Sequence, residues 1–164
     1  MGTKPDASNA ASAASEVAAP HLDLIELWAI GQYVDALVRG ELRRRGLSGE
    51  LLALLASLSR QGPRTIRELS TALGQAFMTV SDHVARLEAS GEVERIDHPS
   101  DGRSKLVVLT GAGRQRVQQG APHVRTVIAA IERHLSGNVR TARAAAVDLR
   151  RAVQLAFEEL EAGE

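Results

Sequence analysis

The stretch that decides the fold of this chain is TIRELSTALGQAFMTVSDHVARLEASG, residues 65–91. Thr65 and Glu68 have the spacing of a capping box, in which the hydroxyl and the carboxylate each satisfy a free amide at a helix start. Apolar residues then recur at helical spacing until Gly74, a residue that tolerates the left-handed conformation of a sharp turn. A second helix is predicted over residues 77–89. Two short helices joined by a glycine turn form a helix-turn-helix.

The next segment, VERIDHPSDGRSKLVVLT at residues 93–110, predicts a β-hairpin. Residues 93–96 and 105–109 have the composition of strands, and the residues between them are dense in turn formers. A helix-turn-helix followed by a hairpin is the winged helix-turn-helix architecture, in which the hairpin is the wing.

Two helices are predicted before this region. Apolar residues recur at three- and four-residue spacing from residue 22 to about residue 45, which indicates an amphipathic helix. A short leucine-rich helix follows, with Ser48 as its N-cap and Gly62-Pro63 as its stop. Residues 1–20 are small and polar and carry no apolar period, so we expect a disordered tail there.

Two long helices are predicted after the hairpin. Thr110 caps the first, which Gly120 and Pro122 are expected to kink or interrupt because proline removes an amide donor. Ser136 is expected to start the second. The apolar stripe over residues 139–160 is longer than one small domain covers unaided, so it indicates a partner chain.

The predicted fold class is therefore mainly α with a small β-hairpin: a winged helix-turn-helix flanked by long N- and C-terminal dimerisation helices. The expected parts are a disordered tail (1–20), an N-terminal dimerisation helix (21–48), a winged helix-turn-helix DNA-binding region (49–116) and C-terminal dimerisation helices (117–164).

Composition excludes several classes of protein. The absence of cysteine excludes disulfides, thiolate metal clusters and cysteine nucleophiles. No apolar run approaches the ~18 residues of a membrane span, and no secretory signal is visible, so we expect a cytoplasmic protein. Twenty basic residues balance twenty acidic ones, so a DNA site would have to be a local patch.

Several short motifs in and around these two helices and the hairpin together indicate one protein family. They are Leu69 and Gly74 around the turn, Thr79-Val80-Ser81 and Leu87 in the second helix, Gly91-x-Val93-x-Arg95 after it, and the wing run Asp101 to Lys105 ending in Val108-x-Thr110. Over residues 51–117 the chain resembles the multiple-antibiotic-resistance regulator (MarR) family of dimeric DNA-binding repressors. The resemblance implies a homodimer that binds double-stranded DNA at a pseudo-palindromic operator and is released by a small-molecule effector.

Ten candidate DNA-binding residues follow from the resemblance and from the predicted outward face of the second helix. A helix of this kind enters the major groove, where base edges are distinguishable. The resemblance implies that Arg103 reaches the minor groove and that Asp101 orients it by an ion pair. The ten are Arg64, Phe77, Met78, Thr79, Ser81, Asp82, Arg86, Asp101, Arg103 and Lys105.

These residues also have structural alternatives. Asp101 and Arg103 could simply close the loop, Phe77 or Met78 could pack inward, and Arg86 could be a solvated surface charge. Asp82 stands where family members commonly carry arginine, and Gly102 replaces a second wing arginine. Asp82 either repels the DNA backbone or accepts a hydrogen bond from a cytosine amino group. A winged helix that has lost DNA binding and serves as a protein-interaction module is therefore the alternative function.

The resemblance also implies a pocket for a small aromatic or phenolic effector, lined by His21, Trp28 and Tyr33. The alternative for these residues is a core or dimer contact. His83 lies among apolar positions and is expected to be a core histidine with its hydrogen bonds satisfied.

No enzyme, metal site or cofactor is expected. Gly111-Ala112-Gly113 lacks the third glycine of the dinucleotide fingerprint, and no P-loop or nucleophile elbow is present. His123, Glu132 and His134 lack a tight metal-ligand spacing on one helical face.

Overall fold

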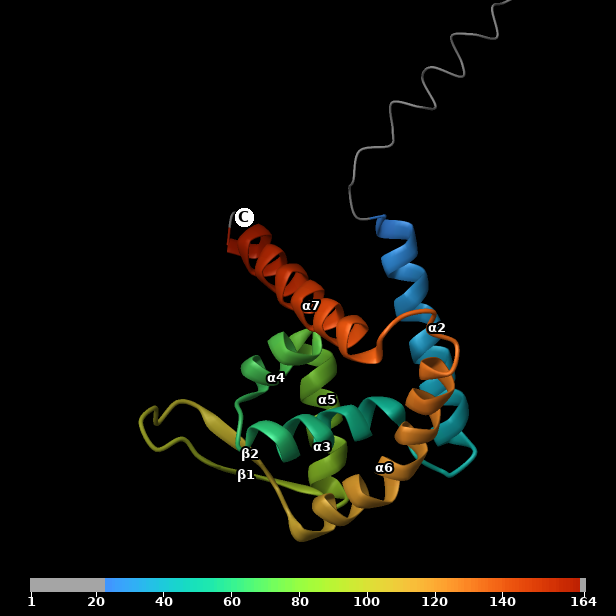
Figure 1. The fold of residues 1–164 in the computed structure, drawn as a ribbon. Coiled ribbons are helices and arrows are strands. Elements are labelled where there is room, and N and C mark those ends of the chain that lie inside the picture. Colours follow the sequence, from blue (N-terminus) through green and yellow to red (C-terminus); the bar gives the residue numbers. More distant parts are fainter. Residues whose placement is uncertain (1–22, 163–164) are drawn as a thin grey trace, which may run out of the picture. The chain divides into compact units, whose positions relative to one another are not determined.

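A computed structural model of the chain describes residues 23–162 (Figure 1). The tail expected over residues 1–20 lies outside the described residues. The elements are α2 (Leu24–Arg43), α3 (Gly49–Gln61), α4 (Ile66–Leu73), α5 (Phe77–Ala89), β1 (Val93–Asp97), β2 (Lys105–Leu109), α6 (Gly111–Glu132) and α7 (Val139–Ala162). The mainly helical fold with one hairpin is as predicted.

The chain divides into two compact units, and the boundary falls between Asp35 and Ala36, inside α2. The first half of α2 belongs to the first unit. The second unit holds the end of α2 and all the later helices and strands, including the complete winged helix-turn-helix.

An aliphatic core holds α3, α4, α5 and the hairpin together, and these elements lie side by side in Figure 1. Removing one such side chain from water contributes about 1.5–3 kcal/mol, so this cluster is the main source of stability for the region. Its buried members are Leu54, Leu55, Leu58, Leu69, Val80, Val84, Leu87, Val93 and Val107.

The capping box at the start of α4 forms as predicted. The Thr65 hydroxyl accepts from the Glu68 amide at 3.2 Å, and the Glu68 carboxylate accepts from the Thr65 amide at 2.8 Å. The hydrogen bond from the Thr65 amide is the main reason that the pKa of the Glu68 carboxyl lies below its ordinary value. Gly74 ends the helix at φ 61°, the left-handed conformation that makes the turn.

The hairpin is extended by a third short segment that the sequence analysis did not anticipate. β1 and β2 pair antiparallel, with Val93 opposite Leu109. On the other side of β2, the Val107 amide donates to the Arg64 carbonyl at 2.7 Å and the Arg64 amide donates back at 3.2 Å. A single bridge residue leaves no alternating pattern in the sequence, which is why composition does not reveal it.

The interruption expected at Gly120 and Pro122 does not occur, because α6 runs unbroken from Gly111 to Glu132. Gly120 instead allows close packing, since a Cβ there would lie 2.4 Å from Leu52 Cδ2 on α3. The Pro122 carbonyl also accepts from the Thr126 hydroxyl at 3.2 Å. Packing against α3 therefore outweighs the amide donor that proline removes.

The predicted start of the last helix at Ser136 is also wrong. α7 begins at Val139, and the Asn138 side-chain oxygen accepts from the Arg140 amide at 2.7 Å. Asparagine caps a helix at least as well as serine, so the later of the two candidate residues sets the boundary.

Both terminal helices expose their apolar stripes. On α2 these residues include Leu24, Ile25, Trp28, Val34 and Leu37, and on α7 they include Val147, Val153, Leu155, Phe157 and Leu160. Exposed apolar area on this scale is typical of an interaction surface.

Candidate nucleic-acid interface

The outward face of α5 presents the side chains predicted to contact bases. Val80, Val84 and Leu87 are fully buried on the inward face. Phe77 and Met78 are 48% and 68% exposed, so the alternative that one of them packs inward is wrong. The other outward positions are Thr79, Asp82, Ala85 and Arg86, all exposed, and Ser81, which is half-buried.

The turn before α5 fixes the position of that face. The Ser70 hydroxyl donates to the Gln75 carbonyl at 2.6 Å, and the Gly74 amide bonds back to the end of α4. Because these bonds join the end of α4 to the residues that lead into α5, they orient the first turn of α5.

The wing differs from the expectation in one contact. The Asp101 carboxylate accepts from the Arg103 amide at 3.0 Å and from the Ser104 hydroxyl at 2.6 Å. The Ser104 hydrogen bond, followed by the Arg103 amide, lowers the pKa of the Asp101 carboxyl. The expected ion pair between Asp101 and the Arg103 guanidinium is not formed, because the short aspartate side chain closes the loop on the backbone two residues ahead.

Ion pairs neutralise half of the basic residues between 64 and 116. The pairs are Arg64–Glu68 at 3.1 Å, Arg95–Glu88 at 3.2 Å, Arg116–Glu92 at 3.3 Å, and Lys105–Asp97. Two of the ten predicted residues, Arg64 and Lys105, are therefore already paired with a carboxylate.

The other four basic residues have no carboxylate partner among residues 23–162. They are Arg67, Arg86, Arg103 and Arg114, all exposed, and of these the Arg114 guanidinium donates to the Leu109 carbonyl at 2.9 Å. Arg67 is not one of the ten predicted residues. Glu68 lies next to it in sequence, but that carboxylate is used by Thr65 and Arg64, and only the structure shows this.

Asp82 is likewise exposed and without a cationic partner in the part of the chain that the structure describes. Its negative charge stands on the same outward face as Met78 and Arg86, one helical turn from each. The predicted conflict between Asp82 and a DNA backbone therefore remains at the centre of the site.

The two predicted effector residues that the structure describes are exposed to solvent. Trp28 and Tyr33 are 67% and 73% exposed on α2. His21 lies outside the described residues.

A hollow of about 1030 Å³ lies elsewhere, between the α4–α5 turn and α7. Its lining includes Arg67, Gln75, Phe77, Arg150 and Phe157, and the Gln75 side-chain oxygen is buried there without a hydrogen-bond partner. Sequence reasoning missed it because its residues lie more than 70 positions apart.

His83 is half-buried, and its buried Nδ1 atom has no hydrogen-bond partner within residues 23–162, so the expectation of a satisfied histidine is wrong for that atom. The same residues contain no group of histidine, aspartate and glutamate side chains that could hold a metal ion. None of their helices is both long and apolar enough to cross a membrane.

Comparison with known proteins agrees with this geometry, since residues 47–105 match the model of the MarR family. Over these residues the chain is similar to the MarR family. The uncharacterised HTH-type transcriptional regulator YxaD of Bacillus subtilis (strain 168) is 34% identical over 83 residues, which are 51% of this chain. The match spans 56% of that protein, little more than half its length.

Solved structures share the MarR fold beyond this domain. A MarR-family regulator from Silicibacter pomeroyi is 29% identical with a TM-score of 0.62, covering 73% of this chain and 81% of its own. A mutant MarR from E. coli complexed with operator DNA is 22% identical, with a TM-score of 0.65 and coverage of 77% and 89%. CouR from Rhodococcus jostii RHA1, bound to p-coumaroyl-CoA, is 24% identical, with a TM-score of 0.67 and coverage of 80% and 92%.

Proposed function

We propose that this protein is a homodimeric, sequence-specific DNA-binding transcriptional regulator, and specifically a repressor that a small-molecule effector releases from its operator. The observation that carries the proposal is the outward face of α5, where Phe77, Met78 and Arg86 are exposed and Arg86 has no carboxylate partner among residues 23–162.

The free arginines matter more than the net charge of zero. Affinity for DNA comes largely from cations that displace counterions from phosphates, and a cation already held by a carboxylate contributes less. Arg67 and Arg86 are available for phosphates on either side of a groove that α5 enters. Phe77 and Met78 then contact thymine methyl groups, and Thr79 and Ser81 bond bases or phosphates.

The wing supports a second contact. Arg103 extends from a loop whose backbone Asp101 and Ser104 hold in place. A guanidinium is favoured in a narrow A·T-rich minor groove, where the negative potential is strongest. Asp101 thus acts on Arg103 through the loop backbone rather than through its charge.

The exposed stripes of α2 and α7 support the homodimer, because a second copy would bury them. With two-fold symmetry, the two α5 helices would read half-sites about 10 bp apart on a pseudo-palindromic operator.

An effector site is supported by the hollow between the α4–α5 turn and α7. Arg67 and Arg150 suit an anionic group, and Phe77 and Phe157 suit an aromatic ring. A small aromatic or phenolic ligand there would engage Arg67 and Phe77, two residues of the DNA-facing surface. Trp28 and Tyr33 become a second candidate lining only when a partner covers α2.

The second candidate function is a protein-interaction module with weak or lost DNA binding. Asp82 favours it, because it is exposed on the outward face of α5 and has no cationic partner among residues 23–162.

The affinity for duplex DNA, measured by fluorescence anisotropy over a range of salt, separates the two functions. We expect the triple variant R67A/R86A/R103A to bind more weakly and with a shallower dependence on salt than the wild type. Arg125→Ala, an exposed arginine on α6, is the control and should change neither quantity. A folded wild type that binds no DNA at low salt would favour the interaction module.

A further inference from the structure

The loop at the tip of the wing is closed by two side chains, each bonded to a backbone amide two residues ahead. The Asp101 carboxylate accepts from the Arg103 amide at 3.0 Å. Earlier in the loop, the imidazole Nδ1 of His98 accepts from the Ser100 amide at 3.3 Å. Asparagine and aspartate are the residues that usually close a turn in this way. His98 therefore closes its turn as an asparagine would, and its ring carries a second nitrogen in addition.

The hydrogen bond from Ser100 determines where the His98 ring carries its proton. A backbone amide only donates, so Nδ1 accepts and has no proton of its own. The Ser100 hydroxyl lies 3.4 Å from the same nitrogen. In a neutral imidazole the proton is then on Nε2, which makes Nε2 a hydrogen-bond donor.

This Nε2 donor is open to another molecule. His98 is half-buried, but the buried side-chain atoms that lack a partner within residues 23–162 belong to Arg64, Gln75 and His83. Nε2 of His98 has no hydrogen-bond partner within the same range, so solvent reaches it. The ring thus presents a free N–H group beside the tip of the wing.

The carboxylates near this donor are already occupied. Both oxygens of Asp101 accept hydrogen bonds within the loop, and Asp97 pairs with Lys105. Nothing lies within 4 Å of the position that a Cβ on Gly102 would take, so the tip is open. What the loop offers to a partner is therefore donors, from Nε2 of His98 and from the exposed Arg103 guanidinium.

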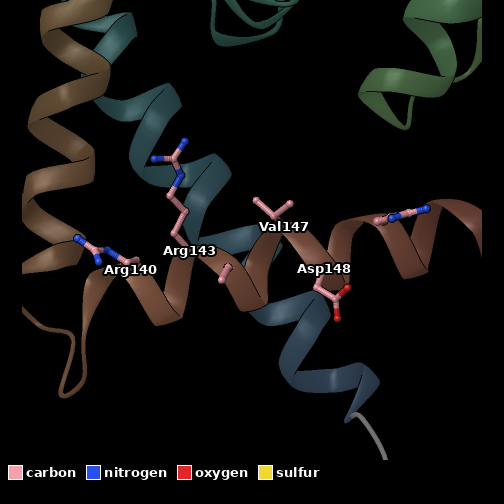
Figure 2. A pocket seen from close by; sticks show the side chains of 6 residues that line it. Arg140, Arg143, Val147 and Asp148 are labelled. Carbon is pink, nitrogen blue, oxygen red and sulfur yellow. The ribbon is translucent and has the colours of Figure 1, made fainter.

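The His98 donor is held in place, unlike exposed arginines elsewhere in the chain. Figure 2 shows Arg140 and Arg143 extending from α7, and neither side chain has a hydrogen bond or ion pair among residues 23–162. A long flexible side chain loses rotamer freedom when it binds, whereas an imidazole already bonded to Ser100 loses little. A donor with a fixed direction also discriminates between acceptor positions.

We infer that His98 is a base-reading residue of the wing, whose Nε2–H group donates to the acceptor edge of an A·T pair in the minor groove beside Arg103. The inference rests on the proposed DNA-binding function. In the minor groove A·T pairs present only acceptors, whereas G·C pairs add the guanine amino donor. An N–H group against that amino group would leave two donors facing each other. His98 thus selects A·T pairs by hydrogen bonding, whereas Arg103 responds to the negative potential of a narrow groove.

Two substitutions separate the proposed contact from the closure of the loop. H98N keeps an acceptor for the Ser100 amide, but its shorter side chain does not extend to the position of Nε2. H98A removes both the acceptor and the donor. The probes are the duplex that the wild-type full-length protein enriches from a random pool, and the same duplex with the A·T pairs that flank each half-site changed to G·C.

Fluorescence anisotropy at fixed salt and about pH 8, where an ordinary imidazole is neutral, gives the affinity for each probe. We expect both variants to bind the A·T-flanked duplex about fivefold more weakly than the wild type, because one hydrogen bond is lost. Their affinity for the G·C-flanked duplex should change much less. H98N should also keep the wild-type dependence on salt, since a neutral imidazole displaces no counterion.

A matched control is H134N, the same substitution at an exposed histidine just after α6, which should change neither affinity. The urea midpoint of H98N should equal that of the wild type, which excludes misfolding as the cause of weaker binding.

Three results would overturn the inference. H98N that binds both duplexes like the wild type, whatever H98A does, would leave His98 at most a loop-closing residue. Equal weakening on the two duplexes would indicate a phosphate contact, which carries no sequence information. A shallower salt dependence in H98N would indicate a charged contact. Each of these leaves the proposed function standing, whereas a folded wild type that binds no duplex would overturn that function and the inference with it.

Discussion

At the residue scale, Gly113 shows how tightly α6 is held against the hairpin. A Cβ at Gly113 would lie 2.1 Å from the Glu92 carbonyl oxygen, a backbone atom that cannot rotate away. We expect Gly113→Ala to lower the free energy of unfolding by about 1–3 kcal/mol, measured by urea denaturation. Gly111→Ala is the matched control in the same helix, since nothing lies closer than 4.0 Å to its added Cβ. An equal loss in both variants would contradict the close approach.

Arg103 and Lys105 lie two residues apart in the wing, but only Arg103 is free of an ion pair within the described residues and so free to bind DNA. Arg103→Ala should cost about 1–3 kcal/mol of DNA binding, mostly at A·T-rich minor groove, without loss of folding. Lys105→Ala should cost less, because Asp97 already holds that ammonium group. Anisotropy titrations at one salt concentration would measure both. Unchanged affinity in Arg103→Ala would show that the wing is only structural.

Replacing Asp82 should raise or lower the affinity for DNA, depending on what the Asp82 carboxylate contacts in the complex. It has no partner within the described residues, so we expect it to repel phosphates. Asp82→Asn should then strengthen binding to specific and non-specific duplexes about equally. If Asp82 instead accepts from a cytosine amino group, the same change weakens only the specific site, by roughly 1–3 kcal/mol. The two affinities measured at fixed salt distinguish these cases.

At the scale of elements, the capping box gives α4 a pH dependence. The pKa of Glu68 is lower in the folded chain than its ordinary value, so the carboxylate contributes stability above that value and loses it as the pH falls. Urea midpoints between about pH 6 and pH 3 should show a smaller loss of stability in Glu68→Gln than in the wild type. Identical pH profiles would mean that the capping box does not stabilise the folded state.

The sequence predicts the elements well wherever a local signal sets them. The boundaries of α5 and β2 follow from Gly74, Ser90 and the apolar spacing, and Ser48 and Thr110 cap helices as expected. The exceptions depend on tertiary contacts. Gly120 looks like a helix breaker until Leu52 is seen to pack on it, and the strand bridge at Arg64 exists only because β2 lies alongside.

At the scale of the whole molecule, the sequence predicts which side chains of α5 face outward but not which charges near them stay unpaired. Phe77, Met78 and Asp82 can be placed outward by helical spacing alone. Which arginines remain free depends on distances between elements, such as those that join Arg95 to Glu88 and Arg116 to Glu92. A residue count of this region therefore gives near neutrality, whereas the structure leaves Arg67, Arg86 and Arg103 unpaired by any carboxylate of the described residues.

The exposed stripes of α2 and α7 make dimerisation a property of the whole chain. We expect the mass of a dimer by light scattering at micromolar concentration. A phenylalanine buried at an interface contributes strongly to the free energy of association. Phe157→Asp should therefore shift the protein toward monomer while leaving the winged helix-turn-helix folded. A wild type that stays monomeric would contradict this expectation.

The most direct test of sequence-specific DNA binding is selection of duplexes from a random pool by the full-length protein at fixed salt. We predict enrichment of a pseudo-palindrome with half-sites about 10 bp apart, bound by two chains per duplex. The R67A/R86A/R103A variant should enrich no sequence. A folded wild type that also enriches no sequence over the starting pool would contradict the proposed function.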